Sequence, residues 1–305
     1  MVVDLLCAAR VENSTESASC TCKPVYAAII PNIAISSFLC YTTAMMNIVT
    51  IYALGKTSSI LKPLKILLLS LAVSDLCTGL LCLPLNIAWQ IQMLRCNLDK
   101  IPAVLNVFCS NFLYLSSLLG LTVLSADRFV AIQMPLRYKE LVTHKRVVII
   151  VIAKWLFCAI FTVIDLFFTQ KDFSFAIHFT IESTCFVLST CFSFKVYLTA
   201  KLHRHRFLAR SQQVAQSDER TLARLRKSAL GTFWIYLVFW ACYLPNFIVY
   251  CIFHLKNVHT EMQTLETCAA TLVYVNSYLN PIIYCWKMRP IRRTMMNSLR
   301  GLIRK

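Results

Sequence analysis

Five polar side chains that stand in otherwise apolar stretches could together bind a small cation. They are one carboxylate, two hydroxyls and two amides: Asp75, Ser117, Asn276, Ser277 and Asn280. Hard cations prefer oxygen ligands of these kinds, so the set suits Na⁺. A carboxylate in an apolar stretch is costly without a partner, and we expect no Lys or Arg at its depth on the neighbouring stretches. The alternative is a protonated Asp75 that is hydrogen-bonded to Asn280 and Asn47.

The sequence offers no arrangement typical of an enzyme. No nucleophile is placed beside a general base, and no His or Cys spacing is typical of a catalytic metal. We therefore expect binding rather than catalysis.

The composition indicates a membrane protein. Of 305 residues, 58% are hydrophobic and 15% are charged, whereas soluble domains carry about 25% charged residues. Apolar runs long enough to cross a bilayer as helices recur near residues 26–54, 64–91, 101–133, 146–168, 177–202, 229–254 and 262–286. These runs predict an all-α bundle of seven transmembrane helices. A transporter or channel is the alternative, but the paired repeats and broken helices typical of transporters are absent from the sequence.

The net charge of +17 is distributed unevenly along the chain. By position, 23 of the 31 Lys and Arg fall in alternate connections and in the carboxy-terminal tail. This bias places those segments in the cytosol and the amino-terminus outside, and it favours a multi-pass plasma-membrane protein over a nucleic-acid-binding one. Residues 1–25 are then an extracellular segment, in which Asn13 begins an N-glycosylation acceptor.

The ends of the predicted helices carry two further patterns. Leucines at helical spacing within 204–227 predict that the adjoining helices extend into the cytosol. Residues 287–305 alternate apolar and basic side chains, which predicts a short amphipathic eighth helix on the inner leaflet; a disordered basic tail is the alternative. In contrast, residues 169–178 are expected to form a short outer connection.

Residues in all seven stretches resemble the sequence pattern of the rhodopsin-like (class A) G-protein-coupled receptors. They are Asn47, Asp75, Ser117, Asp127, Arg128, Phe129, Trp155, Tyr197, Phe239, Cys242, Pro245, Asn280, Pro281 and Tyr284. The resemblance extends over residues 26–303. It implies a receptor that binds an extracellular small molecule, lipid or peptide and activates a heterotrimeric G protein on the cytosolic face. It also implies that Na⁺ at the Asp75 set favours the inactive state.

The resemblance assigns the activation switch to Asp127, Arg128, Phe129, Tyr197, Phe239, Tyr243, Pro245, Asn280, Pro281 and Tyr284. Arg128 is expected to pair with Asp127 at rest, and Tyr197 and Tyr284 to meet near it on activation. Leu225 stands where many members carry an acid that faces this arginine, so we expect appreciable basal signalling. Tyr243 replaces the usual tryptophan of the switch.

Inward-facing positions near the outer end are candidate ligand contacts: Ser110, Asn111, Tyr114, Glu182, Asn246, Phe247, Tyr250, Glu266 and Tyr274. Ser110 stands where amine receptors of the family carry an aspartate, which argues against that class. Tyr274 stands where opsins carry the retinal lysine, so we expect no retinal and disfavour an opsin-like photoreceptor. Single acids near helix ends, Glu182 and Glu266 among them, are expected to be solvated; the alternative is that they attract a cationic ligand or peptide.

Ala103 replaces a cysteine that ties the second outer loop to the third helix in most members. This loss, the short outer loop and the lack of a proline in the fifth helix resemble the melanocortin branch of the group that also holds the lysophospholipid, cannabinoid and adenosine receptors. The outer cysteines are Cys7, Cys20, Cys22, Cys96 and Cys268. Their pairing stays open, with free thiols as the alternative.

Overall fold

The structure is a computed structural model that describes residues 23–95, 100–135, 137–168, 171–209, 216–256, 262–289 and 291–296. Most of the predicted extracellular segment, including Asn13, Cys7, Cys20 and Cys22, lies outside this range, as does Cys96.

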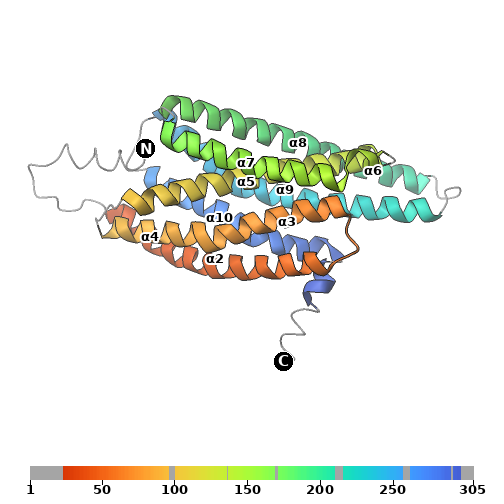
Figure 1. Ribbon diagram of the computed structural model, residues 1–305, viewed down its shortest axis with the longest axis horizontal. Coiled ribbons are helices and arrows are strands. Elements are labelled where there is room, and N and C mark those ends of the chain that lie inside the picture. The colour runs from red at the N-terminus through yellow and green to blue at the C-terminus, as the bar shows by residue number, and fades with distance from the viewer. Residues whose placement is uncertain are drawn as a thin grey trace, which may run out of the picture.

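Long helices that run side by side form the described fold, and the described residues contain no strand. Their bounds are α2 (Lys23–Lys56), α3 (Lys62–Cys77), η1 (Thr78–Cys82), α4 (Leu83–Leu94), α5 (Lys100–Gln133), α6 (Tyr138–Leu141), α7 (His144–Phe168), α8 (Lys171–Ala209), α9 (Gln216–Lys256) and α10 (Met262–Lys287). The run α3–η1–α4 is one crossing and α6 is a short connecting helix. The fold is therefore the predicted bundle of seven long helices, with α2 beginning at one end and α10 ending at the other (Figure 1).

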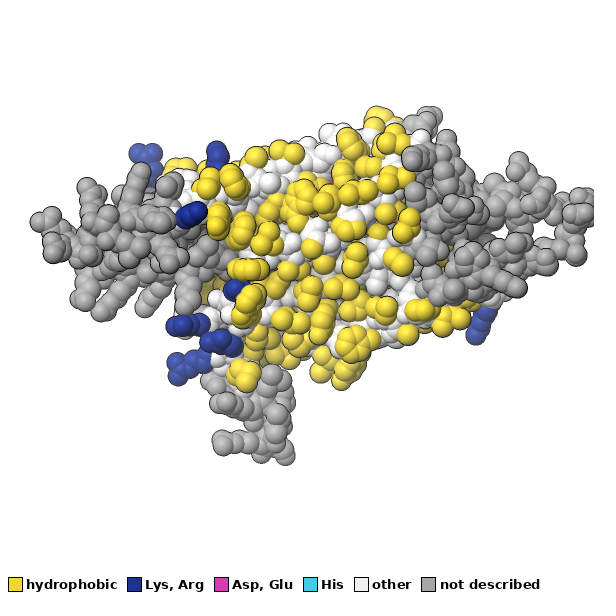
Figure 2. All heavy atoms as spheres, turned by 180° about the vertical axis from the view of Figure 1, so that it is seen from behind, with side chains coloured by type: hydrophobic (Ala, Val, Ile, Leu, Met, Phe, Trp, Pro, Cys, Tyr) yellow, Lys and Arg dark blue, Asp and Glu magenta, His cyan; other side chains and the backbone are white. Residues whose placement is uncertain are grey.

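The surface of the bundle has the character expected of a membrane protein. Within the described residues, six helical segments between Ile29 and Ile252 are long and apolar enough to span a bilayer. Apolar side chains cover the middle of the face in Figure 2, and Lys and Arg gather toward one end. Large exposed apolar residues such as Ile149 and Phe167 are costly in water but favourable against lipid tails.

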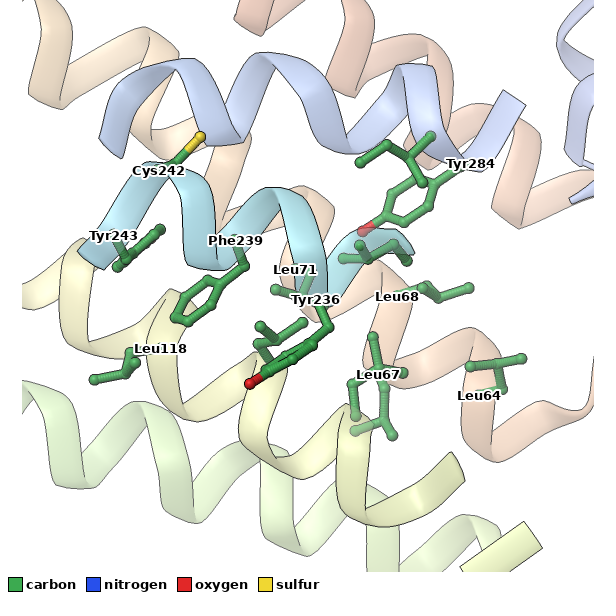
Figure 3. Packing of buried hydrophobic residues seen from close by; sticks show 14 of the residues in the cluster. Leu64, Leu67, Leu68, Leu71, Leu118, Tyr236, Phe239, Cys242, Tyr243 and Tyr284 are labelled. Atoms are coloured by element: carbon green, nitrogen blue, oxygen red, sulfur yellow. The ribbon is translucent and has the colours of Figure 1, made fainter. Parts of the chain in front are cut away.

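The interior is a continuous apolar cluster contributed mainly by α3, α5, α9 and α10. Leucines of α3 and α5 pack against Tyr236, Phe239 and Tyr243 of α9 and against Tyr284 of α10 (Figure 3). These aromatic residues are buried and in contact with one another, so a shift of α9 must change their packing.

Two connections were predicted with different success. The extension of α8 to Ala209 and the start of α9 at Gln216 match the helical pattern of 204–227. The expected outer connection over 169–178 is wrong, because α8 already begins at Lys171. Phe173, Phe175 and Phe179 give this segment enough apolar surface to continue the helix, and the sequence has no proline or glycine there to end it.

The start of the predicted amphipathic tail packs against the bundle. Residues 291–296 are helical, Ile291 and Met295 are buried, and Arg292 and Arg293 are exposed. Thr294 Oγ1 lies 3.1 Å from Thr57 Oγ1 of α2. Residues 297–305 lie outside the described part of the chain.

A π-helical turn interrupts the second crossing at η1, where α2 approaches most closely. A Cβ added to Gly79 would lie 2.9 Å from the backbone nitrogen of Ala44, and Cys40 Sγ donates to the Gly79 carbonyl at 3.2 Å. Only glycine allows two backbones to pass at this separation. The π turn also shifts the face that α4 presents to the bundle relative to α3.

Candidate functional site

Asp75 lies at the centre of the bundle and is fully buried. Asn280 Nδ2 of α10 donates a hydrogen bond of 2.8 Å to Asp75 Oδ2. Asn47 Nδ2 of α2 donates to the backbone carbonyl of Ser277 at 3.1 Å and to that of Thr43 at 2.9 Å. These bonds join α2, α3 and α10 around one carboxylate.

Several oxygens around this carboxylate are buried without a hydrogen-bond donor. Among the described residues they include Asp75 Oδ1, Asn47 Oδ1, Asn276 Oδ1 and Asn280 Oδ1. Buried polar atoms are normally hydrogen-bonded, so such a group calls for water or a cation. In the protonated alternative the Asp75 O–H would donate to an acceptor such as Asn47 Oδ1; the described residues show no such bond, and Asn47 Nδ2 donates to backbone carbonyls.

The remaining predicted member of the set, Ser117 of α5, is buried and less directly connected. Its hydroxyl lies 3.5 Å from Ser74 Oγ, on the residue before Asp75. The structure therefore brings Asp75, Asn280 and Ser277 together and places Ser117 one side chain away.

Lys154 of α7 contradicts the expectation that no basic side chain reaches the depth of Asp75. Its side chain is buried, and Nζ lies 2.9 Å from Ser116 Oγ, 3.1 Å from the Ser116 carbonyl and 3.3 Å from Ser70 Oγ. The ammonium also lies 4.5 Å from the centre of the Trp155 ring. Lys154 makes its hydrogen bonds to these serines, and no ion pair joins it to Asp75 among the described residues. The sequence did not predict the inward position of Lys154, because a single lysine among the apolar residues of α7 can equally extend outward to the lipid headgroups.

Near the end of α5, Arg128 pairs with its neighbour Asp127, as the sequence analysis predicted. Arg128 Nε donates to Asp127 Oδ2 at 2.9 Å, and Nη2 contacts the same oxygen. Tyr138 of α6 donates to Asp127 Oδ1 at 2.8 Å, and Arg128 Nη2 lies 3.4 Å from the Tyr138 hydroxyl. Burial raises the pKa of the Tyr138 phenol, so the hydroxyl keeps its proton and remains a donor.

Sequence reasoning missed Tyr138, although a tyrosine ten residues after Arg128 in a short connection was a usable signal. The side chain of Leu225 lies outside the described part of α9. Phe129 stacks against Phe192 of α8 with ring centres 5.3 Å apart.

The switch residues of α9 are stacked. The rings of Phe239 and Tyr243 lie 4.1 Å apart, and Tyr243 lies 5.0 Å from Tyr114 of α5. Pro245 lies inside α9, two residues after Tyr243, and removes one backbone hydrogen bond there.

Tyr197 and Tyr284 do not meet in this conformation. Tyr197 is 37% exposed and stacks on Phe233 with ring centres 5.1 Å apart. Tyr284, next to the buried Ile283 and three residues after Pro281 of α10, is fully buried with its hydroxyl unpartnered among the described residues.

The candidate ligand residues separate into two groups within the bundle. Ser110 Oγ and Tyr274 Oη lie 3.3 Å apart, and Asn86 Nδ2 reaches Tyr274 Oη at 3.4 Å. On the opposite side, Tyr114 Oη donates to Glu182 Oε2 at 3.1 Å. The expectation that Glu182 is solvated is wrong: it is 6% exposed, because it faces α5 instead of the bundle rim.

The other candidates lie around these groups or outside them. Phe247 stacks on Phe179 and Tyr250 packs against Phe175, both at ring separations below 6 Å. Asn111 and Asn246 are half-buried, and Glu266 is exposed. Cys268 is an exposed free thiol, and the other outer cysteines, Cys7, Cys20, Cys22 and Cys96, lie outside the described residues.

Comparison with known proteins identifies the family. Residues 46–284 match the model of the 7 transmembrane receptor (rhodopsin family). The chain is 25% identical to adenosine receptor A2b of Gallus gallus, with 85% of each chain covered, and 27% identical to the histamine H2 receptor of Cavia porcellus, over 92% of this chain and 82% of the relative. It is 23% identical to the alpha-1A adrenergic receptor of Mus musculus, over 95% of this chain and 72% of the relative. With seven long helices and a match over most of its length, the chain belongs to the rhodopsin family of seven-transmembrane G-protein-coupled receptors.

Proposed function

We propose that this receptor binds a ligand at its extracellular end and promotes nucleotide exchange on a heterotrimeric G protein at its cytosolic end. The observation that carries the proposal is the closed Asp127–Arg128 pair, with Tyr138 held against it. Arg128 is 2% exposed and cannot reach a partner protein in this arrangement. Opening the cytosolic end of the bundle would free the guanidinium for the G protein.

The proposed switch is a population shift between two packings of the bundle. A ligand favours the active packing only if it binds that packing more tightly. Tyr243 and Phe239 stack at the level where α9 contacts α5, and Pro245 weakens the helix just above them. A small rotation there would move the long cytosolic part of α9 much further than its outer part.

The orientation follows from charge. Lys and Arg gather toward one end of the bundle (Figure 2), the end at which Figure 1 shows α6 and the close of α10. We assign this end to the cytosol by the positive-inside rule, with the amino-terminus outside and the receptor in the plasma membrane.

We further propose that Na⁺ binds at Asp75 and favours the inactive packing. The buried, unpartnered oxygens of Asp75, Asn47, Asn276 and Asn280 fit a hard cation, with Ser277 and Ser117 beside them. When bound, Na⁺ would place a positive charge directly against the Asp75 carboxylate, whereas the Lys154 ammonium is hydrogen-bonded to Ser70 and Ser116. The residues themselves hold α3 against α10 through the Asn280–Asp75 bond, which any rearrangement of α10 must break or move.

The relatives support a small-molecule ligand. They are named for adenosine, histamine and adrenergic ligands. Identity of 23% to 27% does not carry any one of these ligands over to this chain.

A screen for activation in cells that express the receptor with promiscuous Gα subunits tests the proposal. Arg128→Ala serves as the control that removes G-protein coupling without touching the outer end. We expect at least one compound to raise output in wild-type cells and not in the variant. Responses that survive in Arg128→Ala, or ion currents without G protein, would contradict it.

A further inference from the structure

A buried carboxylate without a basic partner lies near the outer end of the bundle. Glu182 of α8 is 6% exposed, and its described hydrogen bond comes from the Tyr114 hydroxyl, 3.1 Å from Oε2. A neutral hydroxyl stabilises a carboxylate much less than a cation does.

The basic group nearest along α8 is already engaged elsewhere. His178, one turn before Glu182, places Nε2 3.0 Å from Asp165 Oδ2 of α7, and Ser174 Oγ donates to the other oxygen of Asp165 at 2.5 Å. Within the described part of the chain, no Lys, Arg or His comes within ion-pair distance of Glu182. The site therefore has a carboxylate and lacks its counter-charge.

Aromatic rings flank the carboxylate. Phe179 and Phe186 lie three residues before and four residues after Glu182, which places all three on one face of α8. Phe247 of α9 packs against both rings, with centres 5.7 Å and 5.5 Å away. Faces of aromatic rings attract cations, and a carboxylate among rings is a recurrent site for an organic ammonium group.

We propose that Glu182 binds the cationic group of the ligand, and that this group is a protonated amine on a small organic molecule. The proposal rests on the receptor function proposed above and names its ligand class. On the α5 side of the proposed ligand site the corresponding residue is Ser110, which carries no negative charge. Its Oγ lies 3.3 Å from Tyr274 Oη and 3.3 Å from Cys82 Sγ. The amine is thus held from α8 instead of α5.

The same contacts connect the amine site to the switch. Tyr114 donates to Glu182 and packs 5.0 Å from Tyr243, which stacks on Phe239 at 4.1 Å. A cation at Glu182 competes with the Tyr114 hydroxyl for the carboxylate. Release or reorientation of Tyr114 changes what Tyr243 packs against, which gives the ligand different contacts in the two packings.

The test measures thermal stability of the purified, lipid-embedded receptor with a panel of small primary amines that includes octopamine and carries no other basic group, each beside its neutral N-acetyl derivative. Glu182→Gln keeps the shape and removes the charge. We expect at least one amine at about 1 mM to raise the Tm of wild type, its N-acetyl derivative to have no effect, and Glu182→Gln to lose roughly tenfold or more in affinity.

Matched variants separate a lost site from a damaged fold. Glu140→Gln makes the same change at an exposed cytosolic carboxylate and should leave amine binding unchanged. Glu182→Asp keeps the charge on a shorter side chain and should retain part of the affinity that Glu182→Gln loses. Tyr114→Phe should still bind the amine but show a weaker G-protein response.

The outcomes distinguish this inference from the receptor function. Equal effects of amines and their N-acetyl derivatives, no stabilising amine in the panel, or unchanged affinity in Glu182→Gln would each overturn the amine site. Amine binding that depends on Glu182 but activates no G protein would leave the site standing and contradict the proposed receptor function.

Discussion

The Tyr138 hydroxyl donates a hydrogen bond of 2.8 Å to Asp127 Oδ1, while Arg128 binds the other oxygen of the same carboxylate. The short helix α6 is thereby tied to the end of α5, and the Arg128 side chain stays buried beside Asp127. In the proposed switch, this hydroxyl contributes to keeping the receptor at rest.

Tyr138→Phe should raise basal G-protein output. The variant keeps the buried ring and loses one hydrogen bond to a charged group, which contributes about 1.5–3 kcal/mol, so the equilibrium constant that favours the resting state should fall roughly tenfold or more. Output without ligand, normalised to surface expression, measures this. Basal output equal to or below wild type would show that the bond does not favour the resting packing.

Asp75→Asn should abolish the effect of NaCl on ligand affinity and on basal output. In wild type we expect agonist affinity to fall as NaCl replaces an organic cation at constant ionic strength, because Na⁺ binds the inactive packing more tightly. Potassium serves as the control cation. The Na⁺ proposal fails if wild type and variant are equally insensitive.

Lys154→Gln should make the receptor respond to less Na⁺. Lys154 and Asp75 are both buried in the bundle, so the ammonium should repel a cation bound at Asp75 by roughly 1 kcal/mol. We therefore expect the NaCl concentration for half-maximal effect to fall by roughly threefold or more. An unchanged midpoint would show that the serines around Lys154 screen its charge.

Gly79→Ala should destabilise the receptor, because the added Cβ would lie 2.9 Å from the Ala44 backbone nitrogen. The clash is with backbone, so one of the two helices would have to shift. The expected cost is about 1–3 kcal/mol, seen as a lower Tm of the purified receptor. Gly55→Ala is the matched control, since nothing lies within 4 Å of its added Cβ. If both variants melt like wild type, η1 is not a close-packed contact.

The number and order of the helices were readable from sequence because hydrophobic length and charge asymmetry are local properties. The Asn280–Asp75 contact was also predictable, since two polar side chains inside apolar helices must find one another. The burial of individual acidic side chains could not be predicted from the sequence. Glu182 and Glu266 both stand near helix ends in sequence, yet one is buried and the other exposed, because the rotation of each helix about its axis decides which.

Lys154 and the start of α8 escaped prediction for related reasons. From the sequence, Lys154 beside Trp155 is expected to face lipid and to extend to the headgroups. Its inward position depends on hydrogen bonds with Ser70 and Ser116 of neighbouring helices. Likewise, residues 171–178 contain polar side chains that resemble a loop. The hydrogen bonds from Ser174 and His178 to Asp165 hold that segment against α7 as helix.

Nucleotide exchange on purified G proteins tests the central claim most directly. Receptor reconstituted in lipid with each Gα class and Gβγ should accelerate GTP-analogue binding by at least one class above receptor-free lipid, even without ligand. Arg128→Ala should return the rate to background while melting at a similar temperature. Rates equal to background for every Gα class, with and without an amine that binds the receptor, would contradict the account.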